Sequence, residues 1–327
     1  MDYKKGKNLS IYDRKGNKYL DLSQAIHGNT LGYAPPVIQK TLKNTINYCN
    51  LPFRTAYNST AKNLRALIEI NPFLAEYKVY AVSREEYLFF LNNAAGEANF
   101  YVEYIERDIL CLQGLSPHLF SKIKKSKKGV YSDIHLLYQQ HPSGLYTQEK
   151  RTDYSNSMLI INSTFPYMKM FPNITNFKGI CISAALPFGY DFFRIICLKE
   201  EYPFKDLYVQ KTGFEILKAG ISYIIRKNIN LQAERIGSLL KTSIEKLVGE
   251  GAIKGFSGEG LNFRIEFRKD IKANDKKGII MDGKRIFYNG ISALVNSKYL
   301  YISPAFCMSD DRVQFIIKKL AELSKHL

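Results

Sequence analysis

Residues 158–189 read MLIINSTFPYMKMFPNITNFKGICISAALPFG and contain two short apolar runs joined by a loop. The runs, at 158–161 and 180–185, have the length and the β-branched content of buried strands rather than of helices. Lys178 lies just before the second run. A lysine between two buried strands is shielded from water, which favours its neutral amine, the form that attacks an aldehyde. This stretch therefore indicates an α/β fold and makes Lys178 a candidate nucleophile.

The N-terminal segment predicts a hairpin, a loop and a helix in that order. Leu9–Leu22 has alternating apolar residues on either side of an Asp13–Asn17 turn, which is typical of a β-hairpin. Two glycines and two prolines predict an irregular loop over Ser23–Pro36, and a helix is expected from about Val37 to Tyr48. The residues that mark this segment are Asp13, Gly16, Tyr19, Leu20, Asp21, Leu31, Gly32, Tyr33 and Pro36.

In order and spacing, these residues resemble the N-terminal segment of the class III aminotransferases, the family of acetylornithine and ornithine aminotransferases. The resemblance extends to the first stretch. There a Pro-Asp-Ile type of turn precedes the family's cofactor lysine, and a strand ends in an aspartate beside the cofactor's ring nitrogen. This chain has Pro172-Asn173-Ile174 before Lys178, and Asn162 at the strand end. The resemblance implies pyridoxal 5'-phosphate (PLP) held as a Schiff base on Lys178, with Asn162 at the ring nitrogen.

A second element of the resemblance lies at Tyr87–Arg107. The sequence predicts a buried strand over Tyr87–Leu91, a tight turn of small residues, and a helix over Glu97–Arg107. A strand, a small-residue turn and a helix N-terminus form an anion site, because free backbone N–H groups and the helix dipole point at the turn. By resemblance, Ala94, Ala95 and Gly96 would hold the cofactor phosphate. The alternative is an ordinary close-packed turn.

Three further residues are candidates by resemblance. Thr212 stands where the family has a threonine that reaches the phosphate of the neighbouring subunit's cofactor, although it could equally cap the helix expected from Phe214. Tyr301 stands where an arginine often binds a substrate carboxylate. His27, in the glycine-rich loop, is a candidate substrate contact, although a histidine in such a loop is more often a local hydrogen-bonding residue.

The resemblance implies PLP-dependent transferase fold type I, which is an α/β fold. A large domain with a mostly parallel sheet flanked by helices would be accompanied by a smaller α+β domain built from the N- and C-terminal segments. With 327 residues the chain can bury such a core. We expect residues 1–48 and 213–327 to form the small domain and residues 49–212 a large domain that is shorter than usual.

Composition adds few constraints. The formal net charge of +17 is compatible with a polyanionic partner, but lysines spread along the whole chain favour a compositional bias, and nucleic acid is not the expected partner. The five cysteines are scattered without metal-ligand spacing, which predicts buried free thiols and no metal site. No apolar run approaches a membrane span, so a cytoplasmic protein without membrane contact is expected.

Three functions remain open at this point. The first is a PLP-dependent aminotransferase that acts on small amines and oxo-acids and completes its pockets as a homodimer. The second is a catalytically silent relative that serves as a binding or assembly partner. The third is a basic nucleic-acid binder that uses the lysine-rich run Lys122–Lys128. The sequence favours the first, because Lys178 and the turn at 94–96 could together hold the cofactor.

Overall fold

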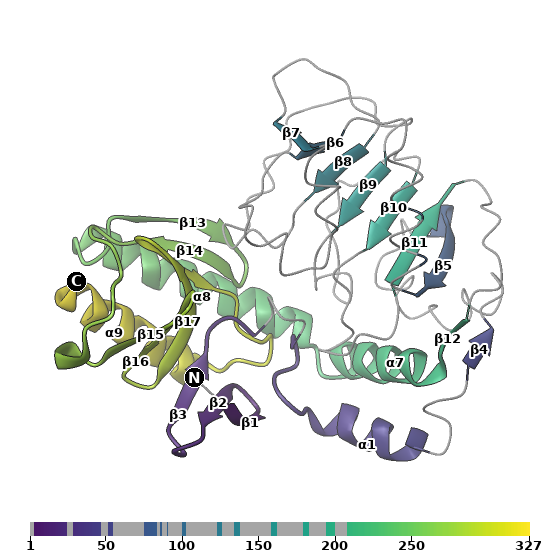
Figure 1. Ribbon diagram of the computed structural model, residues 1–327, viewed down its shortest axis with the longest axis horizontal. Coiled ribbons are helices and arrows are strands. Elements are labelled where there is room, and N and C mark those ends of the chain that lie inside the picture. The colour runs from purple at the N-terminus through teal and green to yellow at the C-terminus, as the bar shows by residue number, and fades with distance from the viewer. Residues whose placement is uncertain are drawn as a thin grey trace. The chain divides into compact units, whose positions relative to one another are not determined.

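The structure, a computed structural model, describes residues 3–24, 29–46, 52–54, 75–83, 86, 90, 100–102, 123–125, 134–137, 158–161, 179–182, 194–199 and 208–327. The chain divides into two compact units (Figure 1). Unit 1 includes Met1–Gln39 and Tyr223–Leu327, and unit 2 includes Lys40–His141 and Tyr146–Ser222. The two units divide between residues 39 and 40 and between residues 222 and 223. The sequence predicted domain boundaries between residues 48 and 49 and between residues 212 and 213. Each unit is described by itself.

Unit 2 is built on a seven-stranded sheet in the order β5-β11-β10-β9-β8-β6-β7. Its strands are β5 (Lys78–Val82), β6 (Phe100–Val102), β7 (Ile123–Lys125), β8 (Ile134–Leu137), β9 (Met158–Ile161), β10 (Gly179–Ile182) and β11 (Arg194–Leu198). β11 runs antiparallel to both of its neighbours, and the other pairs are parallel. Among the described side chains of this sheet, Val79–Val82 of β5 and Ile195–Leu198 of β11 are buried. Near-continuous apolar runs of this kind are what a mostly parallel sheet requires.

Several strand predictions in unit 2 are confirmed. The predicted strands at 158–161 and 180–185 correspond to β9 and β10. The sequence also predicts strands at 192–198 and 135–138, which correspond to β11 and β8. The predictions over Tyr87–Arg107 are wrong where they can be checked. Phe90, expected in a strand, is helical, and Phe100–Val102, expected in a helix, is strand β6, which pairs with β7 and β8. Tertiary pairing has overridden the helical interpretation of that segment.

Two further strands belong to unit 2, and two helices contain its boundaries with unit 1 in the chain. β4 (Pro52–Arg54) and β12 (Tyr208–Gln210) form a small antiparallel pair. α7 (Lys211–Arg226) follows β12 directly, and α1 (Pro36–Thr45) confirms the helix expected after the Gly/Pro loop. None of the helices in the described ranges is both long and apolar enough to cross a membrane.

Unit 1 is built on a nine-stranded sheet that combines both ends of the chain. Its strands are β1 (Tyr3–Lys7), β2 (Ser10–Asp13), β3 (Lys18–Asp21), β13 (Gly255–Glu259), β14 (Asn262–Glu266), β15 (Ile279–Asp282), β16 (Arg285–Tyr288), β17 (Ile291–Asn296) and β18 (Tyr299–Ile302). The N-terminal and C-terminal strands join where β3 pairs in parallel with β17. β2 and β3 form the predicted hairpin, whose turn contains Gly16 at a φ of 88°, a backbone angle that glycine adopts without strain.

Helices α8 (Ile229–Gly249) and α9 (Asp310–His326) pack together in unit 1, and the 3-10 turn η6 (Asp275–Lys277) precedes β15. The sequence predicts a break between two amphipathic helices at Asn228–Asn230, and the chain breaks between α7 and α8 at Asn228, which adopts a left-handed conformation. Ser309 occupies the N-cap position of α9 but makes no side-chain capping bond, and Asp310 and Asp311 complement the helix dipole. The sequence predicts a buried face of α9 made of Val313, Ile316, Ile317, Leu320 and Leu323. All of them are buried except Ile317, which is partly exposed.

Candidate functional site

The carboxyl ends of the parallel strands mark the place in unit 2 where an open α/β sheet binds ligands. β5 ends at Val82, β9 at Ile161 and β10 at Ile182. Any residue that contacts a ligand at this edge of the sheet should therefore follow one of these strands in the chain.

Lys178 and Asn162 lie outside the described residues, and the strands next to them in the chain are β10 and β9. Gly179, which follows Lys178 in the chain, is the first residue of β10 and pairs with Met158, the first residue of β9. Ile161, which precedes Asn162, is the last residue of β9 and pairs with the last residue of β10. The described neighbours of the two candidates thus lie at opposite ends of one parallel strand pair, about 10 Å apart along the strand.

The strand-to-helix turn at the carboxyl end of β5 is closed by the chain itself. The backbone N–H of Ser83 donates to Glu86 Oε2 over 2.8 Å, and the backbone N–H of Glu86 donates to Ser83 Oγ over 3.1 Å. This reciprocal pair is a capping box, in which side chains satisfy backbone donors that a helix start leaves open. A carboxylate therefore already occupies part of the position where an anion would bind to this helix start.

Thr212 is the second residue of α7, so the alternative that it caps a helix beginning at Phe214 is wrong, because the helix already begins at Lys211. Its side chain is buried, and its Oγ1 has no hydrogen-bond partner among the described residues. A buried hydroxyl without a partner at a helix start is the described feature of unit 2 that best suits a phosphate group.

The remaining candidates are not brought together by the described structure. Ala94, Ala95, Gly96 and His27 lie outside the described residues. Tyr301 is buried in β18, with its backbone paired to Arg264 and Leu294. Burial of this side chain within the sheet of unit 1 gives it no open position for a substrate.

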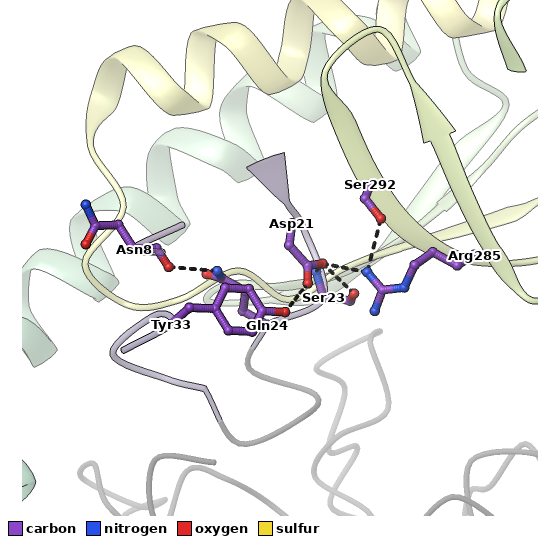
Figure 2. Close-up of polar contacts among 7 residues, drawn as sticks. All are labelled: Asn8, Asp21, Ser23, Gln24, Tyr33, Arg285 and Ser292. Atoms are coloured by element: carbon purple, nitrogen blue, oxygen red, sulfur yellow. Dashed lines mark hydrogen bonds and ion pairs between the residues drawn. The ribbon is translucent and has the colours of Figure 1, made fainter. Parts of the chain in front are cut away.

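A different polar cluster, in unit 1, is well defined (Figure 2). Asp21, at the end of β3, is completely buried and accepts hydrogen bonds from three side chains. Tyr33 donates to Oδ2 over 2.5 Å, and Ser23 donates to Oδ1 from both its hydroxyl and its backbone N–H. Arg285 Nη1 completes the cluster at 2.9 Å from Oδ1 and also donates to Ser292 Oγ. The cluster joins β3 to β16 across 264 residues of sequence.

Electrostatics in this cluster favour the charged carboxylate. Burial would raise the pKa of Asp21, but Arg285, Tyr33 and Ser23 outweigh burial and lower it below its ordinary value. Burial and the Asp21 charge raise the pKa of Tyr33, so its hydroxyl stays protonated as a donor. The pKa of Arg285 is raised by Asp21 against the effect of its own burial. The cluster is therefore a buried ion pair with its acceptors satisfied.

The lowered pKa gives stability a defined pH dependence. Because the carboxyl pKa in the folded state lies below its unfolded value of about 3.9, the contribution of Asp21 is complete above that value and is lost as pH falls through the folded pKa. We expect the urea midpoint of the wild-type chain to fall more steeply below about pH 4 than that of an Asp21→Asn variant. Equal slopes for the two proteins would contradict this assignment.

The chain resembles known proteins in fold only. No protein-family model matches it, and no curated protein matches its sequence. Solved structures do match. Acetylornithine aminotransferase from Elizabethkingia anophelis superimposes with a TM-score of 0.72 at 14% identity, covering 100% of this chain and 94% of that one. The chain has the fold of an aminotransferase.

Two other aminotransferases extend the comparison. Taurine:2-oxoglutarate aminotransferase from Bifidobacterium kashiwanohense, solved with PLP and glutamate, has a TM-score of 0.66 at 11% identity and covers 99% of this chain and 91% of that one. Ornithine delta-aminotransferase from Plasmodium falciparum has a TM-score of 0.66 at 14% identity, with coverage of 99% and 93%. At these identities the likeness concerns the aminotransferase fold alone. The mostly parallel sheet of unit 2 and the separate sheet of unit 1 are consistent with fold type I.

Two groups of functional interest were missed by sequence reasoning. Ser83 and Glu86 form an S-x-x-E pattern directly after the apolar run of β5, and this pattern was available as a helix-start signal. No sequence pattern near Arg285 indicates its ion pair, because its partner Asp21 is remote in sequence. Among the described residues, no three His, Cys, Asp or Glu side chains gather as a metal site requires. Burial raises the pKa of the Cys197 thiol, as expected for a buried free cysteine.

Proposed function

We propose that this chain is a catalytically silent member of the aminotransferase fold, which acts as a binding or assembly partner, with a second copy of itself as the expected partner. The single observation that carries this proposal is the register of β9 and β10. An aminotransferase needs a lysine amine that carries the cofactor and a second side chain that contacts the ring nitrogen of the same cofactor.

The described chain neighbours of the two candidates for these roles, Gly179 and Ile161, lie at opposite ends of the strand pair, which supports the proposal. Lys178 follows the loop and precedes the amino end of β10, and Asn162 follows the carboxyl end of β9. Ligands of open α/β sheets bind beyond the carboxyl ends of the strands, which is the Asn162 side. A PLP ring beside Ile161, the described neighbour of Asn162, would lie about 10 Å along the strand pair from Gly179, the described neighbour of Lys178.

The capping box after β5 supports the same proposal. A phosphate at this helix start would have to displace Glu86 or accept the repulsion of its carboxylate. In addition, Asn162 can donate a hydrogen bond to a ring nitrogen or accept one from it, but carries no charge to keep that nitrogen protonated. We infer that the residues of unit 2 do not fit PLP bound in the way that Lys178 chemistry requires.

A second candidate function is a PLP-dependent aminotransferase that uses Lys178, with Ala94, Ala95, Gly96 and Thr212 at the phosphate. Two observations favour it. The fold matches aminotransferases over the whole chain, including one solved with PLP and glutamate. The buried, unpartnered hydroxyl of Thr212 could serve a phosphate oxygen. Amino acids and oxo-acids would then be the substrates.

A reduction experiment separates the two candidates. We expect purified protein mixed with excess PLP to lose its yellow colour on gel filtration, and borohydride treatment to leave no pyridoxyl label enriched on Lys178. The matched control is Lys169, a lysine of the same loop, because free PLP labels exposed amines without selection. Stoichiometric label on Lys178 but not on Lys169, together with amino transfer that Lys178→Ala abolishes, would overturn the proposal in favour of the aminotransferase.

A further inference from the structure

The strands β1, β2 and β3 of unit 1 carry a row of alternating cationic and aromatic side chains. Lys5 of β1 is paired with Tyr12 of β2, and Tyr12 is paired with Lys18 of β3. Because cross-strand partners lie side by side on one face of a sheet, these three side chains form a row across the strands. We propose that this face binds single-stranded nucleic acid, with a base stacked on Tyr12 and phosphates at the lysines. The face lies wholly within unit 1, so the proposal does not depend on whether the chain is an enzyme.

The row lies on the outer face of these strands. Successive side chains of a strand point to opposite faces, which puts Ile11 and Tyr19 on the face opposite the row. Ile11 is buried, and the Tyr19 ring packs edge-on against the buried Phe287. Tyr12 is by contrast partly exposed, and both lysines of the row are exposed. The row therefore faces away from the core of unit 1.

Positive charge is concentrated around the row. The exposed cations of residues 3–20 are Lys4, Lys5, Lys7, Arg14, Lys15 and Lys18. The one carboxylate in this range is that of Asp13, which is buried and accepts hydrogen bonds from Asn17. With Asp2 included, residues 2–20 still carry a net charge of +4, whereas an average stretch of this length in the chain carries about +1.

Edge protection explains only part of this charge. β1 is an edge strand of the described sheet, and lysines on an edge strand discourage pairing with another chain. β3 is an inner strand, paired with both β2 and β17, so Lys18 has no such role. A general bias toward lysine also does not place a tyrosine between two lysines in one row. The expectation that nucleic acid is not a partner rests on lysines spread along the chain, and it does not extend to this face.

The Tyr12 ring offers a stacking surface. The Lys5 ammonium lies over this ring, 4.9 Å from its centre. A cation–π contact at an exposed site is weak, and base stacking on an aromatic ring is stronger. A base therefore replaces the ammonium, which moves to a phosphate. Neighbouring strands lie about 4.8 Å apart, so the two lysines of the row stand about 10 Å apart on either side of the ring.

These features favour a single strand over other polyanions. In a duplex the bases are stacked on one another, so their faces are not open to a tyrosine ring. Peripheral binding to an anionic membrane combines cations with large apolar side chains such as Leu and Phe that enter the lipid, and the row contains neither. Grooves and sheets that combine aromatic rings with cations bind single strands with little dependence on sequence.

Fluorescence anisotropy of the full chain with a labelled uridine 12-mer tests the proposal. We expect saturable binding that weakens steeply with salt. Lys5→Gln/Lys18→Gln should reduce the affinity about tenfold, and the slope of log affinity against log salt by about 1.4, the value for two phosphate contacts on a single strand. Lys318→Gln/Lys325→Gln is the matched control, because both lysines are exposed on α9 and the change in charge is the same. This control should bind as the wild type does.

Tyr12→Leu separates stacking from charge. It removes the ring but no charge, so the affinity should fall about tenfold while the salt slope stays the same. No saturable binding, an equal loss in the α9 control, or equal affinity for a duplex of the same length would overturn the proposal. Tighter binding to phosphatidylserine vesicles than to the 12-mer would also overturn it, in favour of a membrane surface. Unchanged circular dichroism of the variants shows that the fold is intact.

Discussion

Replacing Arg285 with methionine should lower the free energy of unfolding of unit 1 by about 3–5 kcal/mol, because the change leaves the fully buried Asp21 carboxylate without its counter-charge. Methionine keeps most of the side-chain volume, so the loss reports electrostatics more than packing. Urea denaturation followed by circular dichroism measures the effect.

The surface offers a matched control of the same residue types. Arg235 forms a two-pronged contact with Asp310, with distances of 2.6 and 2.5 Å, but both side chains are more than half exposed. Arg235→Met should leave the urea midpoint essentially unchanged, because water screens an exposed pair. If both methionine variants lost the same stability, burial would not explain the strength of the Asp21 cluster.

A double-mutant cycle checks the assignment further. Asp21→Asn in the Arg285→Met background removes the orphaned charge and should restore part of the stability, with a coupling energy of up to about 3 kcal/mol. The asparagine oxygen can still accept a hydrogen bond from Ser23, which donates to Oδ1, or from Tyr33, which donates to Oδ2, but one of the two loses its acceptor. Additive losses would mean that Arg285 acts through some other contact.

The fold was predictable from the sequence where burial is continuous. β9, β10 and β11 are short apolar runs, and buried parallel strands have this pattern. The hairpin of β2 and β3 was predictable because turn residues fix its position, and Gly16 supplies the left-handed angle that the turn requires. Local chemistry determines these elements, so the sequence contains enough information to place them.

The segment after β5 shows the opposite case. The run YLFFL at 87–91 fits a buried strand or one face of a helix equally well, because five apolar residues are too few to reveal a period. Ser83 and Glu86 resolve the ambiguity in favour of a helix start, and the helical state of Phe90 agrees. The phosphate turn expected at 94–96 lies outside the described residues and stays a prediction.

The Asp21 cluster could not have been predicted. Asp21 was recognised only as part of a motif, and nothing near Arg285 in the sequence indicates a buried pair. The contact depends on the parallel pairing of β3 with β17, which brings two remote strands together.

The packing of α8 against the β13–β14 hairpin leads to the second large effect. A Cβ at Gly237 would come within 2.5 Å of the Gly260 carbonyl oxygen and 2.9 Å of Gly260 Cα. These are backbone atoms, which cannot rotate away as a side chain could, so the helix would have to move off the hairpin. We expect Gly237→Ala to destabilise unit 1 by about 2 kcal/mol, even after the gain of about 1 kcal/mol in helix propensity.

Gly249 of the same helix is the matched control, because a Cβ there meets nothing within 4 Å. Gly249→Ala should stabilise the protein by about 0.5–1 kcal/mol through helix propensity and a less flexible unfolded chain. The same glycine-to-alanine substitution at two positions of α8 is thus expected to change the free energy of unfolding, measured in urea, in opposite directions. The sign at Gly237 depends on the backbone contact alone, so a stabilising Gly237→Ala would mean that α8 does not approach the hairpin as closely as the Gly237–Gly260 distances require.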